Sequence, residues 1–202
     1  MKRKFLAKAI TLGLMLAVPF GVEAAHTLVG DTTVNGETKI YNEATSIIGN
    51  QHNYIINGRL ALSGSSSYIK EVDNLTFGIH GSESSFSAGK IEANNITVKG
   101  RLWTNIGTSI NTSGNFLFEN DRNIDSPDDT NNKVLNCGTI NAGSIESPIY
   151  FKNRGTIVVQ NAIKADAGFN NENTNAKITA DKLIVEKTFN NKGNINVNSI
   201  TA

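Results

Sequence analysis

The chain has 202 residues, which is enough for one domain of ordinary size. Its formal net charge is only +1, so it lacks the excess of Lys and Arg by which proteins bind nucleic acid or anionic lipid. A single cysteine, Cys137, excludes an intrachain disulfide.

The N-terminus has the pattern of a secretory signal peptide. The basic residues Met1–Lys4 precede a mostly apolar run, Phe5–Gly21, and small residues follow at a cleavage site after residue 24 or 25. The alternative is a membrane-spanning helix, but the charge-free part, Ala9–Val22, contains Pro19 and is shorter than the roughly 20 residues that a span needs. Removal of residues 1–24 takes away four basic residues and one acidic residue, which changes the net charge from +1 to −2.

The rest of the chain contains an internal repeat. Its clearest copies are Val134-x-Asn136-x-Gly138-x-Ile140, Phe151-x-Asn153-x-Gly155-x-Ile157, Phe169-x-Asn171 with Ile178 further on, and Phe189-x-Asn191-x-Gly193-x-Ile195. Towards the N-terminus the repeat can be followed with less sequence similarity between units. The first apolar positions of the units are Tyr54, Ile69, Phe86, Trp103, Phe118, Val134, Phe151, Phe169 and Phe189. Their mean separation is about 17 residues, and such a period indicates a repeat architecture.

Each unit is predicted to consist of short strands. Apolar residues alternate with polar ones, as in Ile157-x-Val159 and Ile163-x-Ala165, which indicates strands with one buried face. One unit cannot bury that face alone, whereas units stacked at the strand spacing of about 4.8 Å can. The prediction is an all-β parallel β-helix of about ten coils. A β-sandwich is the alternative, although the repeated lettering and the scarcity of hairpin dipeptides argue against it.

The repeated asparagines are predicted to stack at one corner of the helix. The chain has 28 Asn, a residue that is poor in helix interiors and good in turns and ladders. The expected ladder consists of Asn105, Asn120, Asn136, Asn153 and Asn191. In four of these coils a glycine two positions later is expected to supply a positive φ, namely Gly107, Gly138, Gly155 and Gly193.

The predicted organisation has three parts. Residues 1–24 form the signal peptide, residues 25–53 an N-terminal cap or first coil, and residues 54–202 the β-helix repeats. A solenoid needs such a cap because its first layer has no neighbour.

No residue pattern indicates chemistry, so we expect no catalytic, cofactor or metal site. The acidic residues Asp121, Asp125, Asp128 and Asp129 lack calcium-loop spacing and are interpreted as a solvated loop. The histidines His26, His52 and His80 lie far apart in the sequence, and the serine runs Ser63–Ser67 and Ser82–Ser87 lack a nucleophile elbow and are expected in loops or corners. Cys137 could pair between chains, but a partly covered, unreactive thiol is the favoured interpretation.

These Asn- and Gly-rich coils after a signal peptide, such as Phe189-Asn-Asn-Lys-Gly-Asn-Ile-Asn-Val, resemble the passenger region of bacterial autotransporters and filamentous-haemagglutinin-like adhesins. The resemblance implies an exported rod at the cell surface, at the outer membrane or in the medium, which binds host or bacterial surface ligands in adhesion or virulence. No strands of a C-terminal membrane barrel follow in this sequence, so we expect the natural partner to be such a barrel, further coils or another chain.

The expected function is therefore structural or adhesive, without an enzyme activity, a cofactor or nucleic-acid binding. The alternative is a polysaccharide lyase or hydrolase of the β-helix type, which would need Asp, Lys or Arg aligned on one side of neighbouring coils. A scaffold segment with no binding role is the third possibility.

Overall fold

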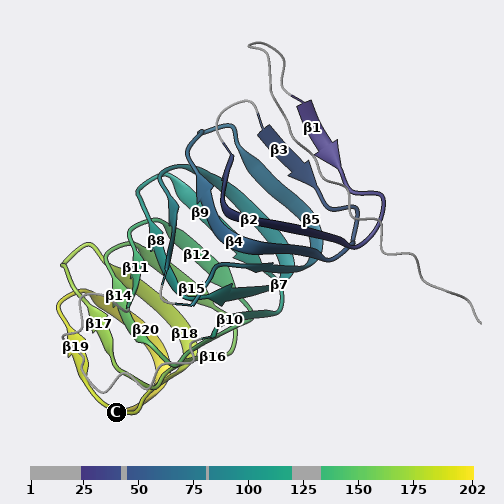
Figure 1. Cartoon of the computed structure of the whole chain (residues 1–202). Helices are drawn as coiled ribbons and strands as arrows, with labels where there is room; N and C mark the ends of the chain where they lie inside the picture. The colour runs from purple at the N-terminus through teal and green to yellow at the C-terminus, as the bar shows by residue number, and fades with distance from the viewer. Residues whose placement is uncertain (1–23, 42–44, 81, 120–132) are drawn as a thin grey trace, which may run out of the picture.

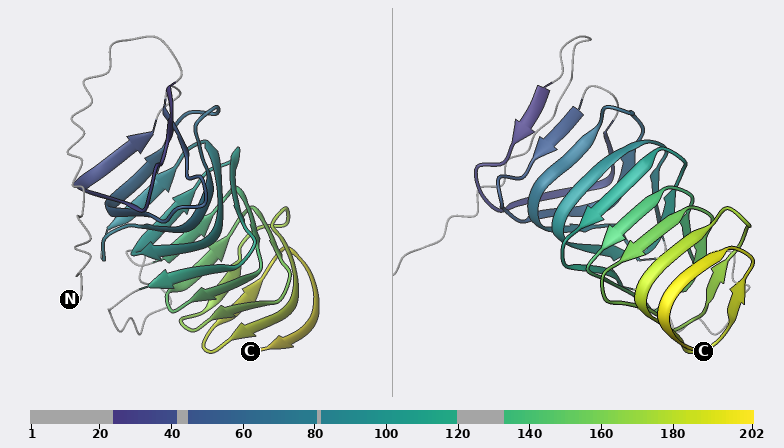
Figure 2. Two further views of the ribbon diagram at one scale, coloured as in Figure 1. Left: turned by 90° about the vertical axis from the view of Figure 1, so that its right-hand side faces the viewer. Right: turned by 180° about the vertical axis from the view of Figure 1, so that it is seen from behind.

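The computed structural model describes residues 24–41, 45–80, 82–119 and 133–202. Within these residues it contains twenty β-strands and no helix. All the strand pairings are parallel, and they join each turn of the chain to the turns before and after it. The chain thus winds into a rod-shaped β-solenoid of about eight turns (Figure 1; Figure 2). The predicted all-β parallel β-helix is confirmed, and the predicted ten or so coils are roughly consistent with this count.

Each turn contributes strands to three faces of the rod. The first face contains β1 (Ala24–Thr27), β3 (Thr45–Ile48), β9 (Thr108–Thr112), β12 (Thr139–Ala142), β15 (Thr156–Val159) and the N-terminal halves of β5 (Tyr68–Phe77), β7 (Gly89–Lys99), β18 (Lys177–Val185) and β20 (Asn194–Thr201). The second face contains the C-terminal halves of β5, β7, β18 and β20, the N-terminal halves of β2 (Thr32–Tyr41) and β4 (Tyr54–Leu62), and β10 (Asn115–Glu119), β13 (Ser144–Ser147) and β16 (Ala162–Ala165). The third face contains the C-terminal halves of β2 and β4 with β6 (Glu83–Phe86), β8 (Arg101–Thr104), β11 (Lys133–Asn136), β14 (Tyr150–Asn153), β17 (Phe169–Asn171) and β19 (Phe189–Asn191).

A column of isoleucines forms the inner side of the first face. Consecutive turns place one isoleucine directly over the next, at Ile47, Ile69, Ile91, Ile110, Ile140, Ile157, Ile178 and Ile195. All but Ile195 are at most 3% exposed. Burial of one such side chain stabilises the fold by about 1.5–3 kcal/mol, and the β-branched side chain also favours the extended backbone. The column therefore sets the register of every turn that it crosses.

Aromatic side chains form the inner side of the third face toward the C-terminus. Val134, Phe151, Phe169 and Phe189 are partners in successive strands. The rings of Phe151 and Phe169 stack with their centroids 5.2 Å apart and an interplanar angle of 7°. Phe118, from the second face, meets Phe151 edge-on at 5.9 Å. The common internal column predicted for Phe151, Phe169 and Phe189 is present.

An asparagine ladder runs beside this aromatic column. The side-chain amide of Asn136 donates to Asn153, that of Asn153 to Asn171, and that of Asn171 to Asn191, at 2.8–2.9 Å. The first three of these side chains are completely buried. Thr104 begins the ladder, since its hydroxyl donates to Asn136 Oδ1 at 2.7 Å. Because each amide bonds the next, the ladder satisfies polar groups that would otherwise be costly to bury.

The ladder differs from the predicted one at Asn105 and Asn171. Asn105 lies outside it, because Thr104 occupies the inward position and the Asn105 side chain instead accepts from the amide of Ile106. Asn171 belongs to it, and Asn120 lies outside the described residues.

The predicted register holds for the last turns and is wrong for the earlier ones. Ladder residues are 17, 18 and 20 positions apart from Asn136 to Asn191. The distance is 22 between Asn35 and Asn57. The spacing between equivalent residues near the N-terminus is therefore longer than the predicted 17 residues. Pairing between turns begins with the first described strands, because β1 pairs with β3 and β2 with β4.

Five of the predicted first apolar positions consequently do not share the column of Val134. Tyr54 and Phe118 lie on the second face and Ile69 on the first. On the third face, Leu102 takes the inward position while Trp103 points outward and is 43% exposed. Phe86 is inward, but it stacks in line with Thr104 and the asparagine ladder. The early strands bend continuously round corners, so their alternation does not show where one face ends.

The glycines that follow the ladder residues allow close packing at the corners, and most of them do not have a positive φ. Of the four predicted to have positive φ, only Gly107 does, at 91°. A Cβ on Gly155 would overlap the carbonyl oxygen of Gly138 and lie 2.7 Å from the carbonyl carbon of Cys137. Only glycine lets the corners of successive turns approach this closely.

We expect Gly155→Ala to lower the free energy of unfolding by about 2 kcal/mol, because the added methyl group meets backbone that cannot rotate away. Urea denaturation followed by circular dichroism measures this change. Gly30→Ala is the matched control, since a Cβ there would meet nothing within 4 Å. Equal stability of the two variants would contradict the close-packing explanation.

Candidate functional site

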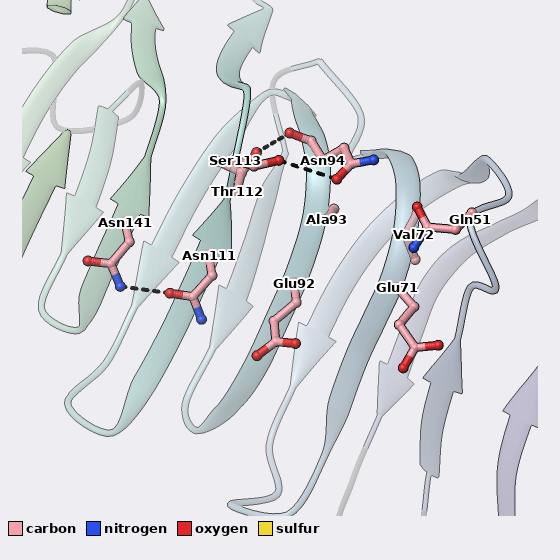
Figure 3. Close-up of a pocket in the computed structure, with 10 residues that line it drawn as sticks. All are labelled: Gln51, Glu71, Val72, Glu92, Ala93, Asn94, Asn111, Thr112, Ser113 and Asn141. Carbon is pink, nitrogen blue, oxygen red and sulfur yellow. Dashed lines mark hydrogen bonds between the residues drawn. The ribbon is translucent and has the colours of Figure 1, made fainter. Parts of the chain in front are cut away.

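A shallow depression on the outer side of the first face is lined mainly by polar side chains (Figure 3). The strands of this face alternate, so each inward isoleucine is followed by an outward residue. In this way Ile91, Ile110 and Ile140 of the column precede the outward residues Glu92, Asn111 and Asn141. The ten lining residues are Gln51, Glu71, Val72, Glu92, Ala93, Asn94, Asn111, Thr112, Ser113 and Asn141.

Glu71 enters the depression because of a bulge. The pairing of β5 with β7 shifts between Ile69 and Val72, and Glu71 has a positive φ of 58°. Its carbonyl oxygen accepts the backbone amide of Gln51, which also has a positive φ, at 2.7 Å. Non-glycine residues in this region are sparsely populated and are held there by their surroundings. The bulge places the Glu71 side chain on the outer side of the face, where its carboxylate lies 3.2 Å from Lys70 Nζ.

Hydrogen bonds fix the amide end of the depression. Asn141 Nδ2 donates to Asn111 Oδ1 at 2.7 Å, and the hydroxyl of Thr112 donates to the carbonyl oxygen of Asn94 at 2.6 Å. Ser113 Oγ donates to Asn94 Oδ1 at 3.2 Å. The result is a preorganised row of amides and hydroxyls beside two carboxylates, spaced by about 4.8 Å per turn. Such a row can hydrogen-bond an extended partner that carries hydroxyl or amide groups.

The remaining residues singled out in the sequence do not converge. His26 lies on β1, His52 lies 3.9 Å from Asp31, and His80 follows β5 on the surface. Asp121, Asp125, Asp128 and Asp129 are outside the described residues. Within the part of the chain that the structure describes, no group of three or more His, Cys, Asp or Glu side chains could hold a metal ion.

The serine runs are structural where the contacts define them. Ser63–Ser67 forms the turn after β4, with Ser67 buried. Part of Ser82–Ser87, expected as a loop or corner, is strand β6, where buried Ser84 accepts the backbone amide of Leu60 through Oγ at 3.1 Å. These contacts explain the serines without a chemical role.

The lone thiol lies at the edge of the third face. Cys137 is half-buried and forms no disulfide. Burial raises the pKa of its thiol above the ordinary value, while the positive charge of Arg154 and a hydrogen bond with Trp103 act in the opposite direction. A raised pKa disfavours the reactive thiolate.

A charged cluster lies in the two turns that follow Cys137. Lys152 and Arg154 are in the first of these turns, and Glu172 is in the second. Glu172 accepts a hydrogen bond from Arg154 Nε, and Lys152 Nζ lies 3.8 Å from its other oxygen. The hydrogen bond from Arg154 is the main cause that lowers the pKa of the Glu172 carboxyl, although burial raises it. The positive charges of Arg154, Lys152 and Lys133 lower it further.

We expect this cluster to make the free energy of unfolding depend on pH below about the ordinary pKa of a glutamate. Because the folded-state pKa of Glu172 is lowered, its stabilisation is fully present above the ordinary value of 4.5 and is lost as pH falls through the lower folded value. Glu172→Gln should therefore lower the free energy of unfolding at pH 7, and by a smaller amount at pH 3. Urea denaturation at the two pH values tests this. Glu92→Gln, an exposed carboxylate on the first face, is the control; equal losses at both pH values for Glu172→Gln would contradict the expectation.

Comparisons with protein families, with curated proteins and with solved structures gave no match to the chain. Within the described residues, no helix has the length and apolar character needed to span a membrane.

The depression was missed by sequence reasoning because its side chains come from separate turns. A signal for it does exist in the sequence, since Glu92, Asn111 and Asn141 each directly follow an isoleucine of the column. Glu71 gives no such signal, because the bulge moves it one position further from Ile69.

Proposed function

We propose that the protein is an exported rod with an adhesive outer surface. The observation that carries the proposal is the repetition of outward side chains in register over successive turns, of which Glu92, Asn111 and Asn141 are one row. Such a row offers the same kinds of hydrogen-bonding group at intervals of about 4.8 Å, which suits weak, repeated contacts with an extended surface ligand.

Two further features support this proposal. The N-terminal pattern of residues 1–24 is that of a signal for export. The rod needs no disulfide, because an inner isoleucine column and an asparagine ladder stabilise it along its length. An autotransporter passenger or haemagglutinin-type adhesin is the class of protein that combines these features, and host or bacterial cell surfaces are the proposed partners.

Bead adhesion tests the proposal. Beads coated with the purified protein should be retained on layers of bacterial or epithelial cells several-fold more than beads coated with albumin. The matched control is the triple variant Glu92→Ala/Asn111→Ala/Asn141→Ala, which removes one outward row and keeps the inward side chains. Retention of the unaltered protein no greater than that of albumin or of the triple variant would contradict the proposal.

A cleavage assay separates this proposal from an enzyme acting on polysaccharides. Glu71 and Glu92 are two carboxylates at one depression, which is the arrangement that general acid–base chemistry would use. We expect no release of reducing ends or unsaturated products from polysaccharides, with or without calcium. Cleavage that disappears in Glu92→Gln would replace the adhesive proposal by the enzymatic one.

A further inference from the structure

We propose that the third face of the rod binds acidic polysaccharide through Trp103 and the cations around it. This inference rests on the proposed adhesive function, because it names the chemical class of ligand that the surface of the rod would hold. It concerns a face separate from the depression that contains Glu71 and Glu92.

The first step of the argument is the position of Trp103. It is the single tryptophan of the chain, and 43% of it is exposed on β8. In the two following turns the same outward row holds Leu135 and then Lys152. The register thus aligns an indole, a leucine side chain and an ammonium group on one flat sheet. An exposed indole offers an apolar plane on which a sugar ring can stack, with a polar edge left for hydrogen bonding.

A second outward row runs beside the first. Arg101 precedes Trp103 by two residues on the same strand and therefore points to the same side of the sheet. Lys133 and Tyr150 continue this row, since they are partners in β11 and β14, and Tyr150 is only 5% exposed beneath the neighbouring side chains. Lys152 Nζ lies 5.9 Å from the centroid of the Tyr150 ring, so this cation is directed across the row.

Among the described residues, the charges around the indole have an excess of positive sign. Lys133, Lys152 and Arg154 all interact with the single carboxylate of Glu172, which leaves two positive charges more than negative ones in the cluster. Arg101 adds a cation beside Trp103 and its register partner Glu83 adds a carboxylate, so the excess stays at two positive charges. An anionic ligand is therefore attracted to this patch, and Arg154 can bind a carboxylate or sulfate group through two parallel hydrogen bonds.

A cluster on the second face has the opposite balance. Lys164 lies within 3.2–3.8 Å of three carboxylates, those of Glu146, Asp166 and Glu186. That cluster has an excess of negative charge and would repel an acidic polymer. Charge complementarity thus favours the third-face patch over this cluster.

Trp103 itself provides the measurement. Fluorescence of the purified protein is followed while polygalacturonate, which carries carboxylates, or dextran sulfate, which carries sulfates, is added; neutral dextran and an oligothymidylate are the comparison polymers. We expect saturable changes with at least one acidic polysaccharide, binding that weakens as salt is raised, and no change with dextran. Equal binding of neutral dextran, absence of binding to both acidic polysaccharides, or tighter binding of oligothymidylate would overturn the proposal.

Variants assign the binding to this patch. By isothermal titration calorimetry, Trp103→Ala and the double variant Lys133→Ala/Lys152→Ala should each weaken binding at least about tenfold. The matched control Lys177→Ala, an exposed cation on the first face, should leave the affinity within about twofold. Circular dichroism checks that each variant keeps the fold, as expected for outward side chains.

Glu172→Gln gives the sharpest result, because it should increase the affinity. Without the carboxylate that now occupies them, Arg154 and Lys152 are available to the ligand. An unchanged or reduced affinity would overturn the proposal. Failure of glycan binding while coated beads still adhere to cells would reject only this ligand, whereas loss of both would reject the adhesive rod as well.

Discussion

Replacement of Phe151 by alanine is expected to lower the free energy of unfolding by about 4 kcal/mol. Phe151 is completely buried between Phe118, which meets it edge-on, and Phe169, which stacks on it. Removing the ring deletes its buried surface and leaves a cavity that the parallel strands on either side cannot close, because their spacing is fixed by backbone hydrogen bonds. Urea or guanidinium denaturation measures the change.

The comparison for this variant is Phe189→Ala in the same column. Phe189 is only partly buried, because it lies in the last turn of the column and has Phe169 on one side alone. We expect its loss to cost less than half as much. If both substitutions had equal effects, stacking between turns would not be the source of the stability.

Replacement of Asn153 by alanine is the second large expected effect, a loss of about 3 kcal/mol. Its amide donates to Asn171 and to the carbonyl oxygens of Gly155 and Lys177, and its oxygen accepts from Asn136. Each buried group left without its partner costs about 1–3 kcal/mol. The ladder is interrupted in its middle, so partners are lost on both sides.

Two further variants distinguish hydrogen bonding from packing at this position. Asn153→Leu restores volume but no hydrogen bonds, so it should remain strongly destabilising. Asn190→Ala removes an exposed asparagine on the outward side of β19, two strands away, and should change stability by less than about 0.5 kcal/mol. A stable Asn153→Leu protein would show that the ladder contributes little.

The C-terminal half of the fold could be predicted from the sequence because its third face uses different inward residues from the other two. Phenylalanine and asparagine mark the third face, whereas aliphatic residues, mostly isoleucine, line the first and second, so Phe151 and Asn153 each identify their own column. In the earlier turns these markers are mixed. Phe86 takes the place of a ladder residue, and Trp103 lies outside next to inward Leu102. Apolar character alone cannot then decide the register.

The two candidate surfaces were not predictable to the same degree. The third-face patch depends on the outward position of Trp103. The sequence Leu102-Trp103-Thr104 does not show which of these side chains points inward until the register is known. The first-face depression depends on the bulge at Glu71, and a left-handed glutamate has no sequence signature. Both are consequences of how distant turns align, which is information that no single turn contains.

The pairing of each turn with only its two neighbours implies a particular response to tension. If the rod is anchored at one end and pulled from the other, the outermost turn can detach while the rest stays intact, as in a zipper. A turn of 17 residues in the C-terminal part, or of 22 near the N-terminus, would lengthen the chain by roughly 60 to 75 Å at about 3.4 Å per residue. Stretching of single molecules should therefore give a staircase of small, similar steps, and a tethered rod of this kind would yield to shear gradually before it broke.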